Sequence, residues 1–367
     1  MEAPSEIKLV LSDLHMGTGE RPGLVNPYED FHFDSRLAEL ICHYATGIHA
    51  KMPIELILNG DILDLLKVPV RGRFVTAVDE NIAVDKVRRC ILGHSQVFDA
   101  MADFLKVLDH TITYIPGNHD PEIAFPLVQQ LIRARLGAVA SPTRLRFIID
   151  EEFLRLPRGV VITHGHLFET INRIETGRMF EDAPDGRRIL NLPYGSRFFT
   201  EVLAPVKAEQ PLIDLVHPLS SMVLWGLVFE IGFTIRLLGR MARWFLTTRI
   251  RRQAREVGLL RTLQVLVDEI VLFTGMDRRA KVFLNDAPDV SALIVGHSHT
   301  PMIRRLPKNK VYVNTGTWVR MVSLDIRNLG TSVDPMFARV EYRPLGPPAV
   351  SLLRWNGKPR NTEEVVA

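Results

Sequence analysis

The sequence is poor in cysteine and in net charge. Cys42 and Cys90 are its only cysteines, and no C-x-x-C pair or partner motif occurs among the 367 residues. We interpret both as buried thiols in a reducing compartment, which excludes a disulfide-stapled secreted scaffold. The net charge is only +3. The chain as a whole therefore lacks the basic signature of a nucleic-acid-binding protein, and nucleic acid is not an expected partner.

A leader, a clean membrane span and an internal repeat are also missing. The chain runs from Met1 through a few polar residues directly into a strand pattern, so we expect a cytoplasmic protein. The most apolar stretch, residues 212–246, is interrupted by Pro218, Glu230 and three arginines. A central charge costs about 2.5–3.5 kcal/mol on membrane insertion. This stretch is therefore not a simple transmembrane helix.

What remains is a composition suited to a large globular fold. Hydrophobic residues make up 46% and charged residues 24%, which allows a sizeable core, and the length allows one large α/β domain or two domains. The first half alternates strand and helix patterns, whereas the second half is rich in strands. This order predicts two sheets packed face to face with helices outside. Strands are expected at 7–11, 54–58, 111–115, 145–149, 153–156, 160–163, 292–295, 302–306, 311–314, 318–324 and 338–342, and helices at about 33–44, 82–108 and 125–136. The tail after Trp355 is expected to fray.

Five of the predicted strands end in a tight polar turn. Six of the 12 histidines lie in these turns, and the others stand singly in predicted helices or loops. Each motif alone is weak, and Asp120 before Pro121 also fits a helix N-cap. Their concurrence indicates one shared site. The turns are Asp13-x-His15, Gly60-Asp61, Gly117-Asn118-His119-Asp120, His164-Gly165-His166 and Gly296-His297-Ser298-His299.

The residue types in these turns indicate metal chemistry. Carboxylate, amide and imidazole ligands without thiolates favour Mn, Fe or Zn, with Mn the preferred candidate. Asp61 could bridge two ions. Two divalent ions about 3.5–4 Å apart can clamp the attacking and leaving oxygens of a displacement at phosphorus.

The ordered set of turns resembles the calcineurin-like metallophosphoesterases over about two thirds of the chain. The resemblance implies a four-layer α/β/β/α sandwich of two mixed sheets, with a binuclear site at the carboxyl ends of the strands. It also implies that His119 protonates the leaving oxygen and is oriented by Asp120, while His166 lies near the phosphate. One metal would take Asp13, His15, Asp61 and His299, and the second would take Asp61, Asn118, His164 and His297.

A long segment does not fit this fold. Between His166 and His297 lie about 130 residues, far more than a connection needs. We therefore divide the chain into a metallophosphoesterase domain (1–167 and 286–357), a mainly helical insertion (168–285) and a tail (358–367).

Within the insertion an apolar stretch becomes cationic and amphipathic from Ile235. Two interpretations stay open. The insertion is a helical lid or dimer arm, or it is a hairpin that lies on an anionic membrane. The residues expected at the membrane interface are Trp225, Phe229, Arg236, Arg240, Arg243 and Trp244.

A membrane-facing cap suggests a lipid-linked substrate. Within the superfamily, the chain is similar to the UDP-2,3-diacylglucosamine pyrophosphohydrolases, which carry a helical insertion near the site. It departs from them at His119, where they commonly have Arg, at His166, where they have an acidic residue, and in the greater length of the insertion.

Three functions follow as hypotheses. The first is a metal-dependent hydrolase on the inner face of the membrane that cleaves a lipid-linked phosphoester or pyrophosphate. The second is a soluble phosphodiesterase or phosphatase acting on nucleotides, and the third is a non-catalytic metal-containing scaffold. The oligomeric state is left open.

Overall fold

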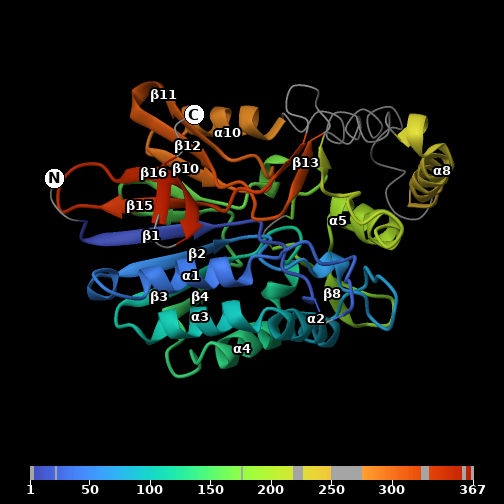
Figure 1. The fold of residues 1–367 in the computed structure, drawn as a ribbon, viewed down its shortest axis with the longest axis horizontal. Coiled ribbons are helices and arrows are strands. Elements are labelled where there is room, and N and C mark those ends of the chain that lie inside the picture. The colour runs from blue at the N-terminus through green and yellow to red at the C-terminus, as the bar shows by residue number, and fades with distance from the viewer. Residues whose placement is uncertain are drawn as a thin grey trace.

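Two β-sheets lie face to face at the centre of the computed structural model (Figure 1). The structure describes residues 4–20, 23–174, 177–217, 226–248, 275–323, 330–357 and 361–364. The first sheet has seven strands in the order β17-β16-β15-β1-β2-β3-β4. The second has five, in the order β11-β12-β10-β6-β5. Both are mixed, as the sequence predicts.

Parallel strands form one side of the first sheet, out to its edge, and the middle of the second. In the first sheet they are β1 (Glu6–Leu11), β2 (Ile54–Asn59), β3 (His110–Ile115) and β4 (Leu145–Phe147). In the second they are β6 (Val160–Ile162), β10 (Ala292–Val295) and β12 (Lys310–Asn314). Antiparallel strands extend the edges, and they are β5 (Leu154–Leu156), β11 (Met302–Leu306), β15 (Met336–Tyr342), β16 (Ala349–Gly357) and β17 (Asn361–Glu364).

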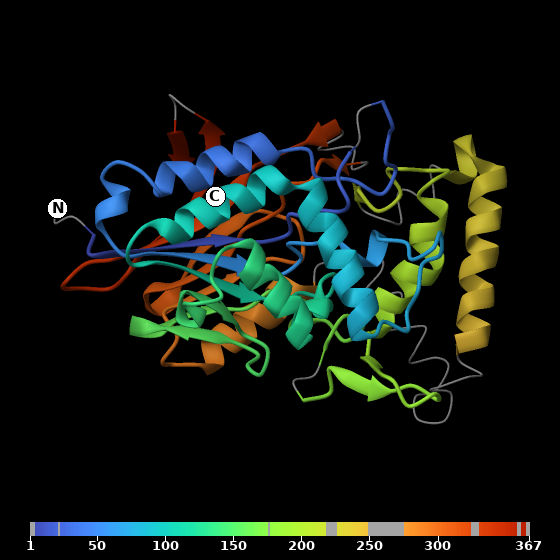
Figure 2. The ribbon, with the colours of Figure 1, turned by 90° about the horizontal axis from the view of Figure 1, so that it is seen from below.

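Helices cover both outer faces, so the fold has four layers and the expected α/β/β/α sandwich is confirmed. Strand side chains alternate between faces. Leu9 and Leu11 therefore pack with the helices, while Val10 packs with Ile162 and Ile294 of the other sheet. The first sheet is covered by α1 (Asp34–Tyr44), α2 (Glu80–Gly93), α3 (Ser95–Lys106) and α4 (Pro126–Arg135), and the second by α10 (Gly275–Asp286) (Figures 1 and 2).

Three element predictions need correction. The single helix expected over 82–108 is two helices, because the backbone leaves the helical conformation at His94, with φ −117° and ψ 38°. The last residue of the first helix, Gly93, packs against the backbone of Thr18 and Gly19 with no room for a Cβ. The strand expected over 318–324 is only β13 (Met321–Ser323). The tail expected to fray contains a strand in its described part, since β16 runs to Gly357 and pairs with β17. All four residues of β17 are polar, so no apolar period marks it as a strand.

The insertion meets the main domain at the carboxyl edge of the central strands. One helical segment is formed by α5 (Tyr194–Phe198), a π-helical turn η7 (Phe199–Leu203) and α6 (Ala204–Val206). Its β9 (Val216–His217) pairs with β13, which lies beside β14 (Gly330–Ser332), and β7 (Phe180–Asp182) pairs with β8 (Arg188–Leu190). The outermost element is α8 (Ile231–Thr248), which stands at the far end of the molecule in Figure 2. Among the described residues, none of the helices combines the length and apolarity needed to span a lipid bilayer.

The loop that follows β1 is fixed to α2 and α3 by a buried ionic contact of His94 with Glu29 and Asp34. His94 Nδ1 lies 2.8 Å from Asp34 Oδ1, and Nε2 lies 3.3 Å from Glu29 Oε2. Burial disfavours the charged ring, but these two carboxylates outweigh it and raise the pKa of His94 from 6.5 to about 9. The raised pKa contributes stability that is complete below pH 6.5 and is lost as the pH rises through 9. This shift corresponds to about 3 kcal/mol at most.

We therefore expect the wild-type protein to lose more unfolding free energy between pH 6 and pH 9.5 than His94→Gln does. Urea denaturation at both pH values measures the difference. An equal loss in the two proteins would show that His94 does not carry the dependence.

Candidate metal centre

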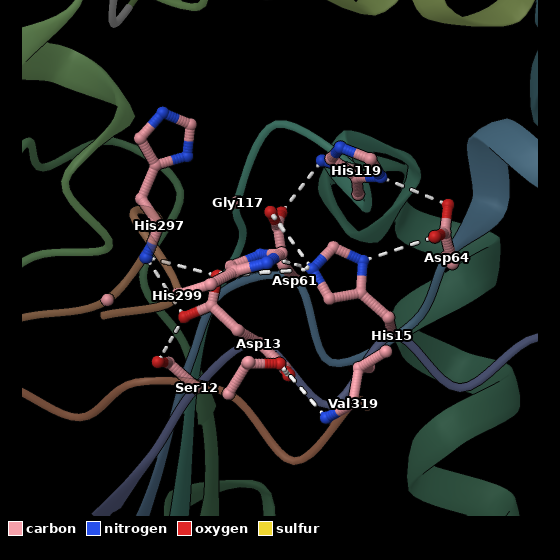
Figure 3. A network of polar contacts seen from close by, with 12 residues as sticks. Ser12, Asp13, His15, Asp61, Asp64, Gly117, His119, His297, His299 and Val319 are labelled. Carbon is pink, nitrogen blue, oxygen red and sulfur yellow. Dashed lines mark hydrogen bonds and ion pairs between the residues drawn. The ribbon is translucent and has the colours of Figure 1, made fainter. Parts of the chain in front are cut away.

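The five polar turns meet at one edge of the two sheets. Asp13 and His15 follow β1, Asp61 follows β2, and Asn118 and His119 follow β3. His164 follows β6, and His297 and His299 follow β10. Because these five strands are parallel within their sheets, their carboxyl ends face the same edge (Figure 3). Residues almost 300 positions apart in the chain thereby come into contact.

One group of ligand atoms surrounds His15 and His299. Their Nε2 atoms lie 3.0 Å apart, and His299 Nε2 lies 3.3 Å from Asp13 Oδ1. His15 Nε2 lies 3.9 Å from both Asp13 Oδ1 and Asp61 Oδ2. Asp13, His15 and His299 are close enough together to hold one ion.

A second group lies on the other side of Asp61. His164 Nε2 is 3.1 Å from Asp61 Oδ2, and the rings of His164 and His297 are 5.2 Å apart. Asp61, His164 and His297 are close enough to hold another ion. Asn118 Oδ1, at the same place, is buried without a hydrogen-bond partner among the described residues. Buried polar atoms are normally paired, so this oxygen is suited to accept a ligand.

The second nitrogen of three of the four expected ligand histidines supports the same interpretation. A metal-bound imidazole usually donates its other N–H to a carboxylate or carbonyl. His15 Nδ1 lies 3.1 Å from Asp64 Oδ2, and His164 Nδ1 lies 2.9 Å from the Asn59 carbonyl. His297 Nε2 lies 2.8 Å from Glu169 Oε2, which leaves Nδ1 as its ligand atom. The oxygen and nitrogen donors present therefore fit divalent ions.

The backbone at the site is strained in a consistent way. Asp13, His15, Asp61, His297 and His299 all have φ between 51° and 71°, a region that costs non-glycine residues about 1–3 kcal/mol each. Gly60 has φ +78°, and a Cβ there would lie 2.5 Å from the His164 ring. Such strain persists only where the surroundings hold it, and it clusters at functional sites.

The acids and the imidazoles of the site shift one another's pKa values. Burial opposes ionisation of Asp61, but His164 and His119 outweigh it and hold the pKa of Asp61 well below 3.8. In return, Asp61 and Asp13 outweigh burial and raise the pKa of His164 to about 10. A divalent cation would replace the imidazolium proton beside Asp61, so metal binding is expected to release protons.

His119 is held by a residue that the sequence reasoning missed. Its Nδ1 lies 3.0 Å from Asp64 Oδ1, whereas the expected partner was Asp120. That expectation is wrong, because the Asp120 carboxylate faces the other way and accepts hydrogen bonds from the backbone N–H groups of Ile62 and Gly117 and from the Tyr114 hydroxyl. Burial and Asp61 raise the pKa of Asp120 to about 6. Asp120 thus shapes the turns that carry Asp61 and Asn118, without contacting the pocket.

His166 does not line the main pocket, which five of the expected ligands do line (His15, Asp61, Asn118, His297 and His299). It is buried beside His164, with ring centroids 5.4 Å apart, and both residues line a second, smaller cavity. Burial and the neighbouring rings of His164 and His297 hold its pKa well below 6.5. The expected position near the phosphate stays a prediction.

The insertion closes the main pocket. This cavity of about 190 Å³ has the metal-binding turns at one end and mostly apolar insertion residues around the rest. Glu169, Lys67 and Asp214 also line it, and none of them belongs to a recognisable motif. The apolar residues are Ile171, Phe198, Phe199, Leu203, Ile213, Leu215 and Val216, joined by Val319 of the main domain.

The residues expected at a membrane interface separate into different environments. Phe229, Arg236, Arg240 and Arg243 are exposed. Trp244 is not, so its assignment to the interface is wrong. Its ring packs on Tyr194 and Phe198, and its Nε1 donates to Glu201 Oε2 at 2.6 Å. Trp225 lies outside the described residues.

Comparison with known proteins finds no matching family model and no matching curated protein. Among solved structures, the chain is similar to a dimetal phosphatase from Danio rerio, with 12% identity, a TM-score of 0.41 and 99% of each chain covered. It is also similar to a predicted phosphoesterase from Streptococcus pneumoniae, with 12% identity, a TM-score of 0.32 and 100% and 99% covered. A third similar structure is Vacuolar Protein Sorting 29 from Cryptosporidium parvum, with 12% identity and a TM-score of 0.32. The match covers 100% of this chain and 98% of that one.

These TM-scores are low, so the likeness to solved structures carries no argument about this chain. Its fold is identified by its own layers and strand order. Five ligand-bearing turns converge where parallel strands of both sheets end. In its motifs and its four layers, the chain resembles the calcineurin-like metallophosphoesterases.

Proposed function

We propose that this chain is a phosphohydrolase that depends on two divalent metal ions. The observation that carries the proposal is the position of Asp61. Its carboxylate belongs both to the group with His164 and His297 and to a group with His15, and it stands between ligands from the two sheets. A shared carboxylate flanked by two sets of neutral and acidic ligands suits a bimetallic centre.

The residues assigned to the metals are those of the two groups. Asp13, His15, Asp61 and His299 would hold one ion, and Asp61, Asn118, His164 and His297 the other. Bound ions of this kind supply Lewis-acid polarisation at phosphorus and lower the pKa of water. The mixed oxygen and nitrogen donors suit Mn, Fe or Zn, and Mn is our preferred assignment.

His119 is the proposed proton donor to the leaving oxygen. Burial disfavours the charged ring, but Asp64 and Asp61 outweigh it and raise the pKa of His119 to about 9. The ring is therefore protonated at neutral pH, as a general acid must be. It lines the pocket beside the ligands of the metals, where it can reach a departing oxygen.

The finer proposal is that the substrate carries a lipid. A phosphoester or pyrophosphate at the metal turns would extend its other end along the apolar insertion residues of the pocket. Burying such an apolar group contributes about 25 cal/mol per Å² of surface removed from water. A UDP-diacylglucosamine-like molecule has the required combination of a pyrophosphate and acyl chains.

The outer face of α8 supports a peripheral position on a membrane. Ile231, Ile235, Leu238 and Leu246 recur at helical spacing and are all exposed. Beside this strip lie exposed Arg236, Arg240 and Arg243. An apolar strip flanked by cations suits the boundary between anionic headgroups and acyl chains. Because anionic lipids are concentrated in the cytoplasmic leaflet, the position that we propose is on its surface.

A matrix of metals and substrates tests the proposed activity. The metals are Mn, Fe, Zn and Mg, and the substrates are bis(4-nitrophenyl) phosphate, a nucleotide diester and UDP-2,3-diacylglucosamine. We expect Mn-stimulated hydrolysis, fastest on the lipid-linked pyrophosphate. Turnover of the soluble esters alone would favour the nucleotide hydrolase, and no turnover with any metal would favour the scaffold.

The membrane proposal predicts a specific effect of charge on α8. Each basic residue near an anionic surface contributes about 1 kcal/mol. The double variant Arg240→Gln/Arg243→Gln should therefore bind vesicles of phosphatidylglycerol and phosphatidylcholine about 30-fold more weakly in sedimentation assays. Arg88→Gln/Arg304→Gln, which removes two exposed charges elsewhere, is the matched control. Equal weakening in both would show that net charge alone drives binding.

A further inference from the structure

A cluster of five buried charged residues connects the insertion to the metal-binding turns. We call it the Lys67 cluster. Asp30, Asp64 and Lys67 come from loops of the main domain, and Lys207 and Asp214 come from the insertion. Their side chains are at most 7% exposed. Charges this deeply buried must be paired, so each position depends on its partners.

Lys67 stands at the centre of the cluster. Its Nζ lies 2.7 Å from Asp64 Oδ2 and 2.8 Å from Asp214 Oδ2, and it also contacts Asp30. Lys207 Nζ pairs with the same two outer acids, Asp30 at 3.0 Å and Asp214. Asp214 is thus the acid through which the insertion holds both ammonium groups.

The cluster ends at the proposed proton donor. The two oxygens of Asp64 are divided between partners, because Oδ1 lies 3.0 Å from His119 Nδ1 and Oδ2 faces His15 Nδ1 and Lys67. Figure 3 shows Asp64 between the two rings. A continuous series of contacts therefore runs from Asp214 through Lys67 and Asp64 to His119.

Other insertion residues contact the turn that carries Asn118 and His119. Ser196 Oγ donates to the Asn118 carbonyl at 2.9 Å. The Phe199 ring packs edge-on against His119, with centroids 5.1 Å apart, and also lies against Lys67. Phe199 begins the π-helical turn, and such turns are frequent at functional sites. The insertion therefore contacts the catalytic turn directly as well as through the Lys67 cluster.

We propose that Asp214 and Lys67 are positioning residues for His119, so that the insertion completes the catalytic site in addition to enclosing substrate. This inference rests on the proposed function. Asp214 holds the Lys67 ammonium group in a position where it pairs with Oδ2 of Asp64 only. Oδ1 of Asp64 is thereby left for His119. Without Asp214, Lys67 and Lys207 retain only Asp30 and Asp64 as acids, and Asp64 shifts toward the ammonium groups and away from His119.

The dependence on the leaving group tests this inference. A misplaced proton donor harms poor leaving groups most, since they need protonation in the transition state. For Asp214→Asn we expect kcat on diphenyl phosphate to fall by about tenfold or more, but kcat on bis(4-nitrophenyl) phosphate by less than about threefold. KM should stay constant, because neither small ester needs the apolar part of the pocket.

Two further variants separate positioning from general damage. Lys67→Arg keeps the charge and should retain more activity on diphenyl phosphate than Lys67→Met does. Glu201→Gln is the matched control, because Glu201 ties the insertion to Thr76 and Trp244 without touching the Lys67 cluster. It should lower kcat on both esters equally or leave both unchanged. An equal loss on both esters in Asp214→Asn would overturn the inference.

A crystal structure of Asp214→Asn gives a readout that does not depend on activity. We expect the contact between His119 Nδ1 and Asp64 Oδ1, which is 3.0 Å in the wild type, to be broken. An unchanged contact would overturn the inference. If the wild type hydrolyses no substrate of the matrix with any metal, the proposed function fails, and the structure of the variant still decides whether Asp214 positions His119.

Discussion

Asp61→Asn should abolish both metal binding and turnover. The substitution replaces a carboxylate that faces ligands of both ions with a neutral amide, so each site loses a negative charge. We expect fewer than one tightly bound ion per chain by mass spectrometry of the metals, where the wild type holds two. Because the ions supply several kcal/mol of transition-state stabilisation, kcat should fall by about 10³-fold or more.

Asp289→Asn is the control for this prediction. Asp289 is an exposed acid that pairs only with Arg155 in the described part of the chain, and it lies away from the pocket. It should retain both ions and full activity. If Asp61→Asn keeps two ions and loses less than about tenfold in kcat, Asp61 does not bridge the metals.

His119→Gln should remove the proton donor and leave the metals in place. General-acid catalysis contributes about 10²–10⁴-fold, so kcat should fall within that range, with the larger loss on the poorer leaving group. A general acid must be protonated to act, and the pKa of His119 is about 9. Wild-type kcat should therefore decline as the pH rises through 9, and the variant should lack that decline.

Metal content separates two roles for this histidine. His119 also lies close enough to His15 and Asp61 to be a ligand itself. Two ions retained in His119→Gln would agree with the proton donor, whereas loss of one ion would make it a ligand. His32→Gln, at an exposed histidine outside the pocket, should change neither metal content nor the pH profile.

The strand order and the metal-binding turns could be predicted because their signals are local. Each ligand directly follows an apolar run whose length and flanking glycine indicate a buried strand, as in Leu56–Leu58 before Gly60 and Asp61. Once those strands are parallel, their ends must lie at one edge. The end of the second half was harder to predict, because the residues of β17, which pairs with β16, are all polar and show no apolar period.

The partners of the buried charges could not be predicted. Asp64 follows the Gly60-Asp61 turn by three residues. Its identity as the partner of His119 depends on η2 (Leu65–Lys67) lying beside the β3 turn. Asp120 was the nearer acid in sequence, yet its carboxylate is occupied by backbone N–H groups. Proximity along the chain is a poor guide where a turn reverses the direction of a side chain.

The insertion was likewise predictable only in part. Its helical periodicity and its arginines were evident in the sequence, but the face of α8 that packs inward was not. A helix with apolar residues on two sides can bury either side, and the contacts of Trp244 with Tyr194 and Phe198 show which side of α8 packs inward.

The sequence by itself determined the ligand types, their order along the chain and the strands that carry them, because these follow from local composition and period. Only the tertiary structure decided which acid orients His119, which residues enclose the pocket and how Asp214 reaches the site through Lys67. Those contacts join residues from separate loops, and buried charges take their partners from whatever the folded chain brings within reach.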